Sequence, residues 1–164
     1  MPILVLDNLI EQQQYDYILS CINRFWKFKK TLMDYESQIY HRYSIHNPSF
    51  LIKIHEQLTT VAEDKFQTKL KKSYCFLSMY LKGEGICPLH TDRPQCKYSI
   101  DLCLDQLEPW SIFVNDLEFM LKPNQALLYS GTDHPHYRNK IQPHNYATLA
   151  FFHFVDFDFE GDLR

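Results

Sequence analysis

Apolar and polar positions change their spacing partway along the chain. From residue 8 to residue 72 the apolar residues recur three and four positions apart, whereas from residue 73 to residue 157 they form short runs of β-branched and aromatic side chains. A helix repeats every ~3.6 residues and a strand every two. The pattern therefore predicts helices in the first part of the chain and strands in the second.

A short strand and a helix are expected at the start. The apolar stretch Leu4–Leu6 predicts the strand, and Asp7 or Asn8 can cap the helix that follows it. The apolar side chains of this helix are Tyr15, Ile18, Leu19, Ile22, Phe25 and Trp26. Their spacing predicts that one face of the helix is buried.

A second helix is expected after a loop over residues 34–47. Asn47 is suited to cap this helix, and Pro48 to occupy its first position. Its apolar stripe comprises Phe50, Leu51, Ile54, Leu58, Val61, Ala62 and Phe66. Positive charge suits the end of a helix, and the lysines expected there are Lys65, Lys69, Lys71 and Lys72.

Short strands separated by turn residues are expected in the second part. They are Tyr74–Leu81, Lys97–Leu104, Ser111–Val114, Leu117–Leu121, Gln125–Tyr129, His136–Lys140 and Tyr146–Val155. Many short strands with frequent turns predict a jelly roll. With two N-terminal helices packed on its outside, the expected fold class is α+β and mainly β.

Length and composition fit a single domain. The chain has 164 residues, of which 45% are hydrophobic and 23% are charged, as in ordinary globular proteins. We expect one domain over residues 1–164, with residues 1–72 as a strand and helical support and residues 73–157 as the β core.

Composition also argues against several classes of protein. No apolar run is long enough to cross a membrane, and the first residues lack the basic segment and cleavage site of a secretion signal. The net charge of −3 creates no field that attracts nucleic acid, so no nucleic-acid partner is expected. The five cysteines form no CxxC pair, which favours free thiols in the cytoplasm. The oligomeric state leaves no signal in the sequence.

Candidate chemistry is concentrated in residues 87–94, which include His90 and Asp92. In an extended backbone, residues two apart point to the same side, so this imidazole and this carboxylate would converge. They would supply two ligands of the two-histidine, one-carboxylate triad that holds non-haem Fe(II). The third ligand must be a histidine from a distant strand, and the candidates are His134 and His136.

The order of these motifs resembles the double-stranded β-helix of Fe(II)- and 2-oxoglutarate-dependent oxygenases, in particular the branch similar to prolyl 4-hydroxylases. The resemblance covers residues 74–156 most clearly and the first half of the chain weakly. The matching residues are Tyr80, His90-Thr91-Asp92, Tyr98-Ser99, Ala126-Leu127-Leu128-Tyr129-Ser130-Gly131 and His136-Tyr137. It favours His136 as the third ligand, and Pro135 agrees because proline cannot donate to a strand ladder that would include His134.

The resemblance implies Fe(II) as the metal, 2-oxoglutarate as the co-substrate and O₂ as the oxidant. His90, Asp92 and His136 would be both the metal ligands and the catalytic residues. The implied reaction is hydroxylation of a C–H bond in a protein side chain, an amino acid or a small metabolite, with decarboxylation of 2-oxoglutarate to succinate. An aspartate at position 92 leaves no site for a halide, which favours hydroxylation over halogenation.

The sequence departs from the family where the distal carboxylate of 2-oxoglutarate is anchored. The family has an arginine or lysine in the last strand, whereas this chain has Leu149. Arg138 is the best replacement, because it lies two residues after His136 and would share the inward face of that strand. Otherwise Arg138 is a surface arginine in a salt bridge. Arg93 and Lys97 are weaker candidates for the anchor, because they lie in the loop expected at the cavity mouth.

Further side chains are expected beside this anchor. Tyr80 faces the same cavity in the family and can add a hydroxyl, and Ser99 and Asp101 share one face of their strand. Asp101 would pair with Arg138 if it is buried, or lie in water at a sheet edge. His153 lines the cavity or is a hydrogen-bonded core residue. Candidate aromatic residues at the cavity mouth are Tyr35, Tyr40, Tyr43 and Trp110.

Two other functions stay open at this point. A cupin-like metal-binding enzyme or sensor would use the same fold without 2-oxoglutarate, and the missing basic residue in the last strand is its support. A non-catalytic interaction domain would keep only the scaffold. Retention of all three candidate metal ligands argues against this third hypothesis.

Overall fold

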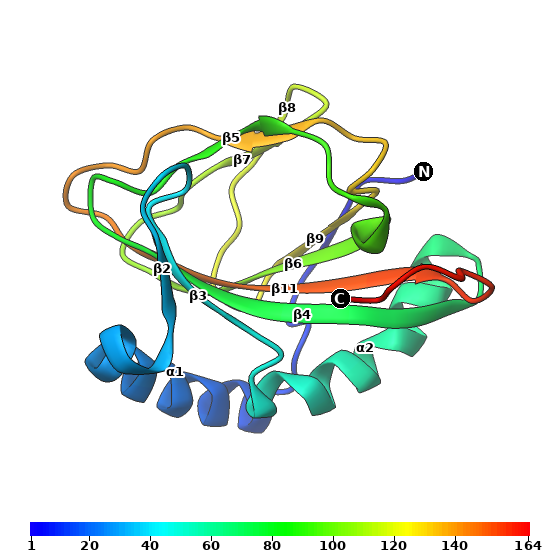
Figure 1. Cartoon of the computed structure of the whole chain (residues 1–164), viewed down its shortest axis with the longest axis horizontal. Coiled ribbons are helices and arrows are strands. Elements are labelled where there is room, and N and C mark those ends of the chain that lie inside the picture. Colours follow the sequence, from blue (N-terminus) through cyan, green and yellow to red (C-terminus); the bar gives the residue numbers. More distant parts are fainter.

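Two antiparallel β-sheets face each other, and two helices cover the outer face of the larger sheet (Figure 1). This computed structural model describes all 164 residues. The larger sheet has seven strands in the order β1-β9-β6-β11-β4-β3-β2, and the smaller has four in the order β5-β10-β7-β8. The expected fold class, α+β and mainly β with a jelly roll and two outer helices, is therefore confirmed.

The larger sheet combines strands from both ends of the chain. In sheet order they are β1 (Leu4–Leu6), β9 (Ala126–Tyr129), β6 (Tyr98–Gln106), β11 (Ala147–Asp156), β4 (Leu70–Tyr80), β3 (Arg42–His46) and β2 (Asp34–Glu36). The central strand β11 pairs with β4 from Ala147 opposite Tyr80 to Asp156 opposite Leu70. This long pairing fixes which residues of both strands face the smaller sheet.

The smaller sheet carries the segments with candidate chemistry. Its strands are β5 (Cys87–His90), β10 (His136–Arg138), β7 (Ile112–Val114) and β8 (Leu117–Phe119). A 3-10 turn, η1 (Pro94–Cys96), leads from β5 into β6. In the pairing of β10 with β5, His136 lies opposite His90. The sheet therefore brings together two motifs that are far apart in the sequence.

The helices α1 (Gln12–Leu32) and α2 (Ser49–Phe66) bury their apolar stripes against the larger sheet (Figure 1). Ile18 and Ile22 of α1, and Leu51 and Leu58 of α2, are almost fully buried. Amphipathic helices gain most of their stability from packing of this kind. Neither helix is long and apolar enough to cross a membrane.

The predicted helix caps are wrong. The first helix begins at Gln12 after Glu11, so neither Asp7 nor Asn8 caps it. At the second helix the N-cap is Pro48, not Asn47. The side chain of Asn47 accepts a hydrogen bond from the backbone N–H of Cys75 at 3.0 Å, so a bond to β4 has taken the place of the cap.

Residues 34–47, expected to be a loop, form the hairpin of β2 and β3. Residues 42–46 alternate polar and apolar side chains, a strand signal that was too short to predict, and they pair along β4. The lysine prediction is also partly wrong, because the second helix ends at Phe66 and β4 begins at Leu70. Lys71 and Lys72 are thus strand residues.

Alternate residues of the larger sheet face two different clusters. Cys75, Leu77 and Met79 of β4 belong to the apolar cluster under the helices. Phe76 and Tyr80 belong to the cluster between the sheets. This two-residue alternation means that β4 contributes to both sides of the sheet.

Candidate metal centre and cavity

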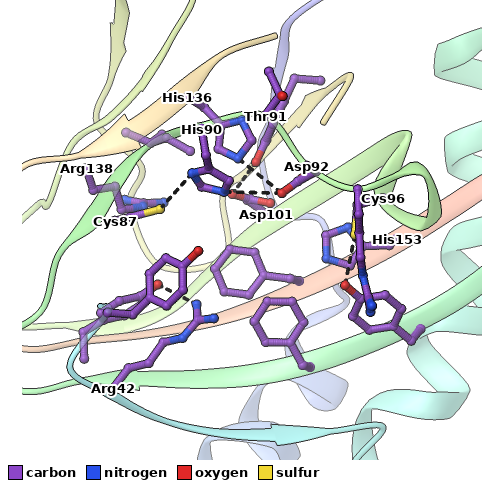
Figure 2. A pocket seen from close by; sticks show the side chains of 18 residues that line it. Arg42, Cys87, His90, Thr91, Asp92, Cys96, Asp101, His136, Arg138 and His153 are labelled. Carbon is purple, nitrogen blue, oxygen red and sulfur yellow. Dashed lines mark hydrogen bonds and ion pairs between the residues drawn. The ribbon is translucent and has the colours of Figure 1, made fainter. Parts of the chain in front are cut away.

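Three side chains converge between the ends of β5 and β10 (Figure 2). His90 ends β5, Asp92 follows two residues later, and His136 begins β10. The Nε2 atoms of His90 and His136 lie 3.4 Å and 3.7 Å from Oδ1 of Asp92. All three ligand atoms lie within 4.8 Å of one another, which is close enough to hold one metal ion. The structure thus brings together the three residues expected from the sequence.

Hydrogen bonds orient both histidines toward the same point. Nδ1–H of His90 donates to the carbonyl of Pro88 at 2.7 Å, and Nδ1–H of His136 donates to the carbonyl of His134 at 2.9 Å. A carbonyl can only accept, so the proton on each ring is held at Nδ1. Nε2 of each ring is thereby turned toward Asp92, and it coordinates a metal there once it has lost any proton, which is the arrangement of metal-binding histidines.

A glycine makes room for the carboxylate. The backbone N–H of Asp92 donates to the carbonyl of Gly131 at 2.8 Å. A Cβ at position 131 would collide with Oδ2 of Asp92 and with the carbonyl of Cys96. Glycine at this position therefore allows the close approach of the two segments that carry Asp92 and His136.

The charge of Asp92 sets the electrostatics of the cluster. The hydrogen bond with Asp92 raises the pKa of His90 to about 11. Burial acts to raise the pKa of Asp92, yet the bond from His90 and the nearby histidines leave it below its usual value. Burial lowers the pKa of His136. Asp92 is therefore ionised in the cluster and can serve as an anionic ligand, and a metal ion would take the place of the proton on His90.

His134, the alternative ligand, lies outside the cluster. It is buried in the turn before β10, where its Nδ1 accepts a hydrogen bond from the backbone N–H of Ser130 at 3.3 Å. The carbonyl of His134 holds the ring of His136. His134 thus orients its neighbour by its backbone.

The cluster forms one wall of a cavity of about 270 Å³ between the two sheets. Aromatic side chains, notably Phe76 and Phe151, make up much of the opposite wall. Their rings stack at 4.5 Å with an angle of 17° between their planes. Three arginines also line the cavity, namely Arg42, Arg93 and Arg138.

Arg138 faces the cavity from β10, as its position two residues after His136 predicts. It is 4% exposed, and its Nη1 donates to the carbonyl of Trp110 at 2.6 Å. Its Nη2 is buried without a hydrogen-bond partner. The expected salt bridge at the surface is absent, so a buried guanidinium donor is available to a ligand.

Asp101 is buried beside the cavity but does not pair with Arg138, so the expected ion pair is wrong. Its Oδ2 accepts from the hydroxyl of Tyr129 at 3.1 Å, and its Oδ1 has no partner. Burial raises its pKa to about 7, although Arg138 acts in the opposite direction. Nη1 of Arg138 bonds to the Trp110 carbonyl instead, and Nη2 of Arg138 and Oδ1 of Asp101 both stay without a partner because they do not reach each other.

Tyr80 and Ser99 occupy different environments. Tyr80 lines the cavity, and its hydroxyl accepts from Nη1 of Arg42 at 2.8 Å. Ser99 is not a cavity residue, because its hydroxyl bonds to Nδ1 of His153 at 2.9 Å and to the carbonyl of Cys96 at 3.1 Å. His153 lines the cavity, and burial lowers its pKa to about 4.

Of the aromatic residues expected at the cavity mouth, some line the cavity and others do not. Tyr40 lines the cavity. Tyr35 and Tyr43 do not, and they contact each other with tilted rings whose centres lie 4.7 Å apart. Trp110 is buried against the ring of Tyr80 and supports the wall from behind.

Sequence reasoning missed Arg42 altogether. It lies opposite Tyr80 in the pairing of β3 with β4, and its guanidinium lies 4.2 Å from the ring centre of Tyr40. The alternation of Arg42, Ser44 and His46 was the signal that could have found it, because it places their side chains on one face of a strand.

No family model and no curated protein matches this sequence. Solved structures match its fold at low sequence identity. A prolyl-4-hydroxylase from Pseudomonas putida superposes with a TM-score of 0.73 at 11% identity, covering 94% of this chain and 92% of that one. The resemblance in fold inferred from the sequence is thereby confirmed.

Two further solved structures contain 2-oxoglutarate. One is HygX from Streptomyces hygroscopicus, with nickel, 2-oxoglutarate and hygromycin B bound. It superposes with a TM-score of 0.73 at 10% identity, covering 96% of this chain and 84% of that one. The other is the viral collagen prolyl hydroxylase of Paramecium Bursaria Chlorella virus-1 in its 2-oxoglutarate complex. It superposes with a TM-score of 0.67 at 11% identity, covering 94% of this chain and 95% of that one.

Proposed function

We propose that this protein is an Fe(II)- and 2-oxoglutarate-dependent dioxygenase that hydroxylates a C–H bond of an organic or peptidyl substrate. The observation that supports this most is the convergence of His90, Asp92 and His136 in the wall of the cavity between the two sheets. The chemistry of this donor set, two imidazoles and one carboxylate, fits Fe(II) and leaves coordination positions open for other ligands.

The cavity also offers what a bound 2-oxoglutarate needs. Arg138 has a buried, unpartnered Nη2 on the same face of β10 as His136, which suits the distal carboxylate. The hydroxyl of Tyr80 and the carboxyl of Asp101 lie in the same cavity, and we assign them to this subsite as well. Ser99 supports it through the ring of His153.

Bound Fe(II), with 2-oxoglutarate and O₂, supplies oxidation of a substrate C–H bond coupled to decarboxylation of 2-oxoglutarate to succinate. The protein's own part is positioning and shielding. With a metal bound, Asp92 would be a ligand at the site that a halide would need, which favours hydroxylation. The stacked Phe76 and Phe151 exclude water from the opposite side of the cavity.

A cupin-like metal enzyme without 2-oxoglutarate is the second candidate. Its support is Leu149, which is 2% exposed and faces the cluster between the sheets at the place where the family has a basic residue. Metal binding without an effect of 2-oxoglutarate, unchanged in Arg138→Ala, would favour this candidate.

Five free cysteines agree with a reducing compartment, and we propose a cytoplasmic location on that basis.

Turnover of 2-oxoglutarate tests the proposal. Protein reconstituted with Fe(II) without oxygen, then given O₂ and 2-oxoglutarate, is expected to release succinate even without its primary substrate. His90→Ala is expected to abolish this release, and His144→Ala, at an exposed histidine outside the cavity, to leave it unchanged. Absence of succinate from the wild-type protein would contradict the proposal.

A further inference from the structure

Two arginines reach into the cavity without a carboxylate partner. Arg42 gives Nη1 to the hydroxyl of Tyr80 but has no partner for its buried Nε. Arg138 gives Nη1 to the carbonyl of Trp110 but has none for its buried Nη2. Neither Arg42 nor Arg138 forms an ion pair. Burying an uncompensated charge is costly, so each guanidinium is suited to an anion that the cavity binds.

The cavity has more cation sites than the co-substrate has free carboxylates. Of the two acids that line it, Asp92 belongs to the metal cluster and Asp101 is bonded to Tyr129. In a chelate with the metal, 2-oxoglutarate keeps one carboxylate at its far end. That carboxylate binds one of the two guanidiniums, so the other guanidinium is left for a second ligand.

Position assigns the two guanidiniums to different ligands. Figure 2 shows Arg138 beside Cys87, level with the metal cluster, and Arg42 across the cavity from it. Arg138 comes from the smaller sheet on the strand of His136, whereas Arg42 comes from β3, near the edge of the larger sheet. Arg138 therefore suits the molecule chelated at the metal, and Arg42 the molecule that lies opposite. The Tyr80 hydroxyl, which accepts from Arg42, then lies where the two subsites meet.

We propose that Arg42 binds a carboxylate of the primary substrate, and that this substrate is a small carboxylic acid with a flat apolar part. The proposal rests on the proposed function, because it gives Arg138 to 2-oxoglutarate.

Aromatic surfaces beside Arg42 supply the apolar part of this subsite. The guanidinium of Arg42 lies 4.2 Å from the ring centre of Tyr40 and 5.3 Å from that of Phe76. Phe76 continues into the stack with Phe151. These rings fix the direction of the guanidinium and provide a flat surface next to it. A cavity of about 270 Å³ shared with 2-oxoglutarate leaves room for a small group.

Titration calorimetry with an acid and its amide tests Arg42 directly. The probes are phenylacetate and phenylacetamide, added without oxygen to protein loaded with Mn(II) and 2-oxoglutarate. Wild-type protein is expected to bind the acid at least about tenfold more tightly, because a charged acceptor strengthens the hydrogen bond. Arg42→Gln is expected to remove this preference, and Arg42→Lys to restore part of it.

Two variants make the result specific. Arg93→Gln removes an exposed arginine at the same cavity and is the matched control, which is expected to keep the preference for the acid. Arg138→Gln is expected to keep the preference as well, but to weaken 2-oxoglutarate binding about tenfold or more. Melting temperatures without ligand establish that each variant is folded, and Arg42→Lys replaces Arg42→Gln if the latter is not.

Two results would overturn the assignment. One is an acid preference that survives in folded Arg42 variants, and the other is a larger loss of 2-oxoglutarate binding in Arg42→Gln than in Arg138→Gln. Failure of wild-type protein to bind 2-oxoglutarate would instead contradict the proposed function, while the acid and amide would still report on Arg42.

A comparison of two peptides shows whether the carboxylate belongs to a small acid or to a peptide C-terminus. Gly-Gly-Phe and its C-terminal amide are compared in the same assay. If the protein binds phenylacetate but not Gly-Gly-Phe, the substrate is a free small acid, as proposed. If it binds Gly-Gly-Phe as tightly as phenylacetate, the proposal of a small-molecule substrate is overturned, and the carboxylate is that of a peptide C-terminus.

Discussion

The two faces of the larger sheet show opposite chemistry on the same strands. The face under the helices contributes to a cluster of 24 buried apolar residues, and the face toward the smaller sheet to one of 15. On β4, Leu77 and Met79 point to the first cluster, and Phe76 and Tyr80 to the second. The helix face carries the larger apolar cluster, and the cavity face holds the candidate metal ligands and Arg138.

The two faces also differ in their buried polar atoms that lack a hydrogen bond. Buried atoms without a hydrogen bond include Nε of Arg42, Oδ1 of Asp101 and Nη2 of Arg138, and all three residues line the cavity. Such groups destabilise a fold unless a ligand meets them. The comparison teaches that the helix face supplies the stability that allows the cavity face to keep these groups ready for ligands.

The largest effect is expected from removing a metal ligand. His136→Ala should lower succinate formation by at least about 100-fold, because two remaining ligands hold the metal weakly. Its melting temperature without ligand should change little, since the cavity face contributes function more than stability. Loss of turnover only in proportion to unfolded protein would contradict this separation.

A matched substitution on the helix face should do the reverse. Phe152 is fully buried under the helices, so Phe152→Ala should lower the free energy of unfolding by about 3–5 kcal/mol. Denaturant unfolding measures this loss. The fraction that stays folded should release succinate at the wild-type rate, and a tenfold slower rate in that fraction would break the comparison.

Acid should destabilise the helix face through His55. Burial lowers the pKa of His55 from 6.5 to about 4, and Nε2–H donates to the carbonyl of His153 at 2.9 Å. Between these two values the unfolded chain binds more protons, so the free energy of unfolding falls as pH falls, by up to about 3 kcal/mol. Unfolding curves from pH 7 to pH 4 measure this slope.

His55→Gln should reduce that slope, and the exposed His144→Gln should not. Because His153 stays in both proteins, the difference between wild type and variant isolates the titration of His55. An equal slope in wild type and His55→Gln would show that other groups cause the acid sensitivity.

The smallest effect is expected at Gly131. A Cβ in Gly131→Ala meets Asp92 and the carbonyl of Cys96, so metal affinity should fall by roughly 10- to 100-fold. Gly161→Ala, near the end of the chain, is the control. Calorimetry with Mn(II) compares the two, and equal affinities would show that Asp92 has room to adjust.

Local patterns and the family resemblance together predicted the three residues of the candidate metal cluster. His90 and Asp92 lie two apart on extended backbone, and His136 opens a strand after a proline, so the side of each residue followed from its immediate neighbours. The same alternation placed Arg138 on the inward face. The jelly roll followed from the run of short strands and turns.

Tertiary pairing decided what the sequence did not predict. Arg42 reaches the cavity because β3 pairs with β4, and Asn47 is drawn from its helix by a bond to Cys75. Arg138 and Asp101 share the cavity, yet each bonds to a different neighbour. Such choices depend on atoms that are distant in sequence, which spacing along the chain does not encode.

Thermal unfolding with Fe(II) and 2-oxoglutarate, in the absence of oxygen, tests the central claim most directly. If His90, Asp92 and His136 hold the metal and the co-substrate chelates it, the two together should raise the melting temperature by about 5 °C or more, exceeding the sum of their separate shifts. His90→Ala should abolish the joint shift. A wild-type protein that shows no shift, or an equal shift in His90→Ala, would contradict the account.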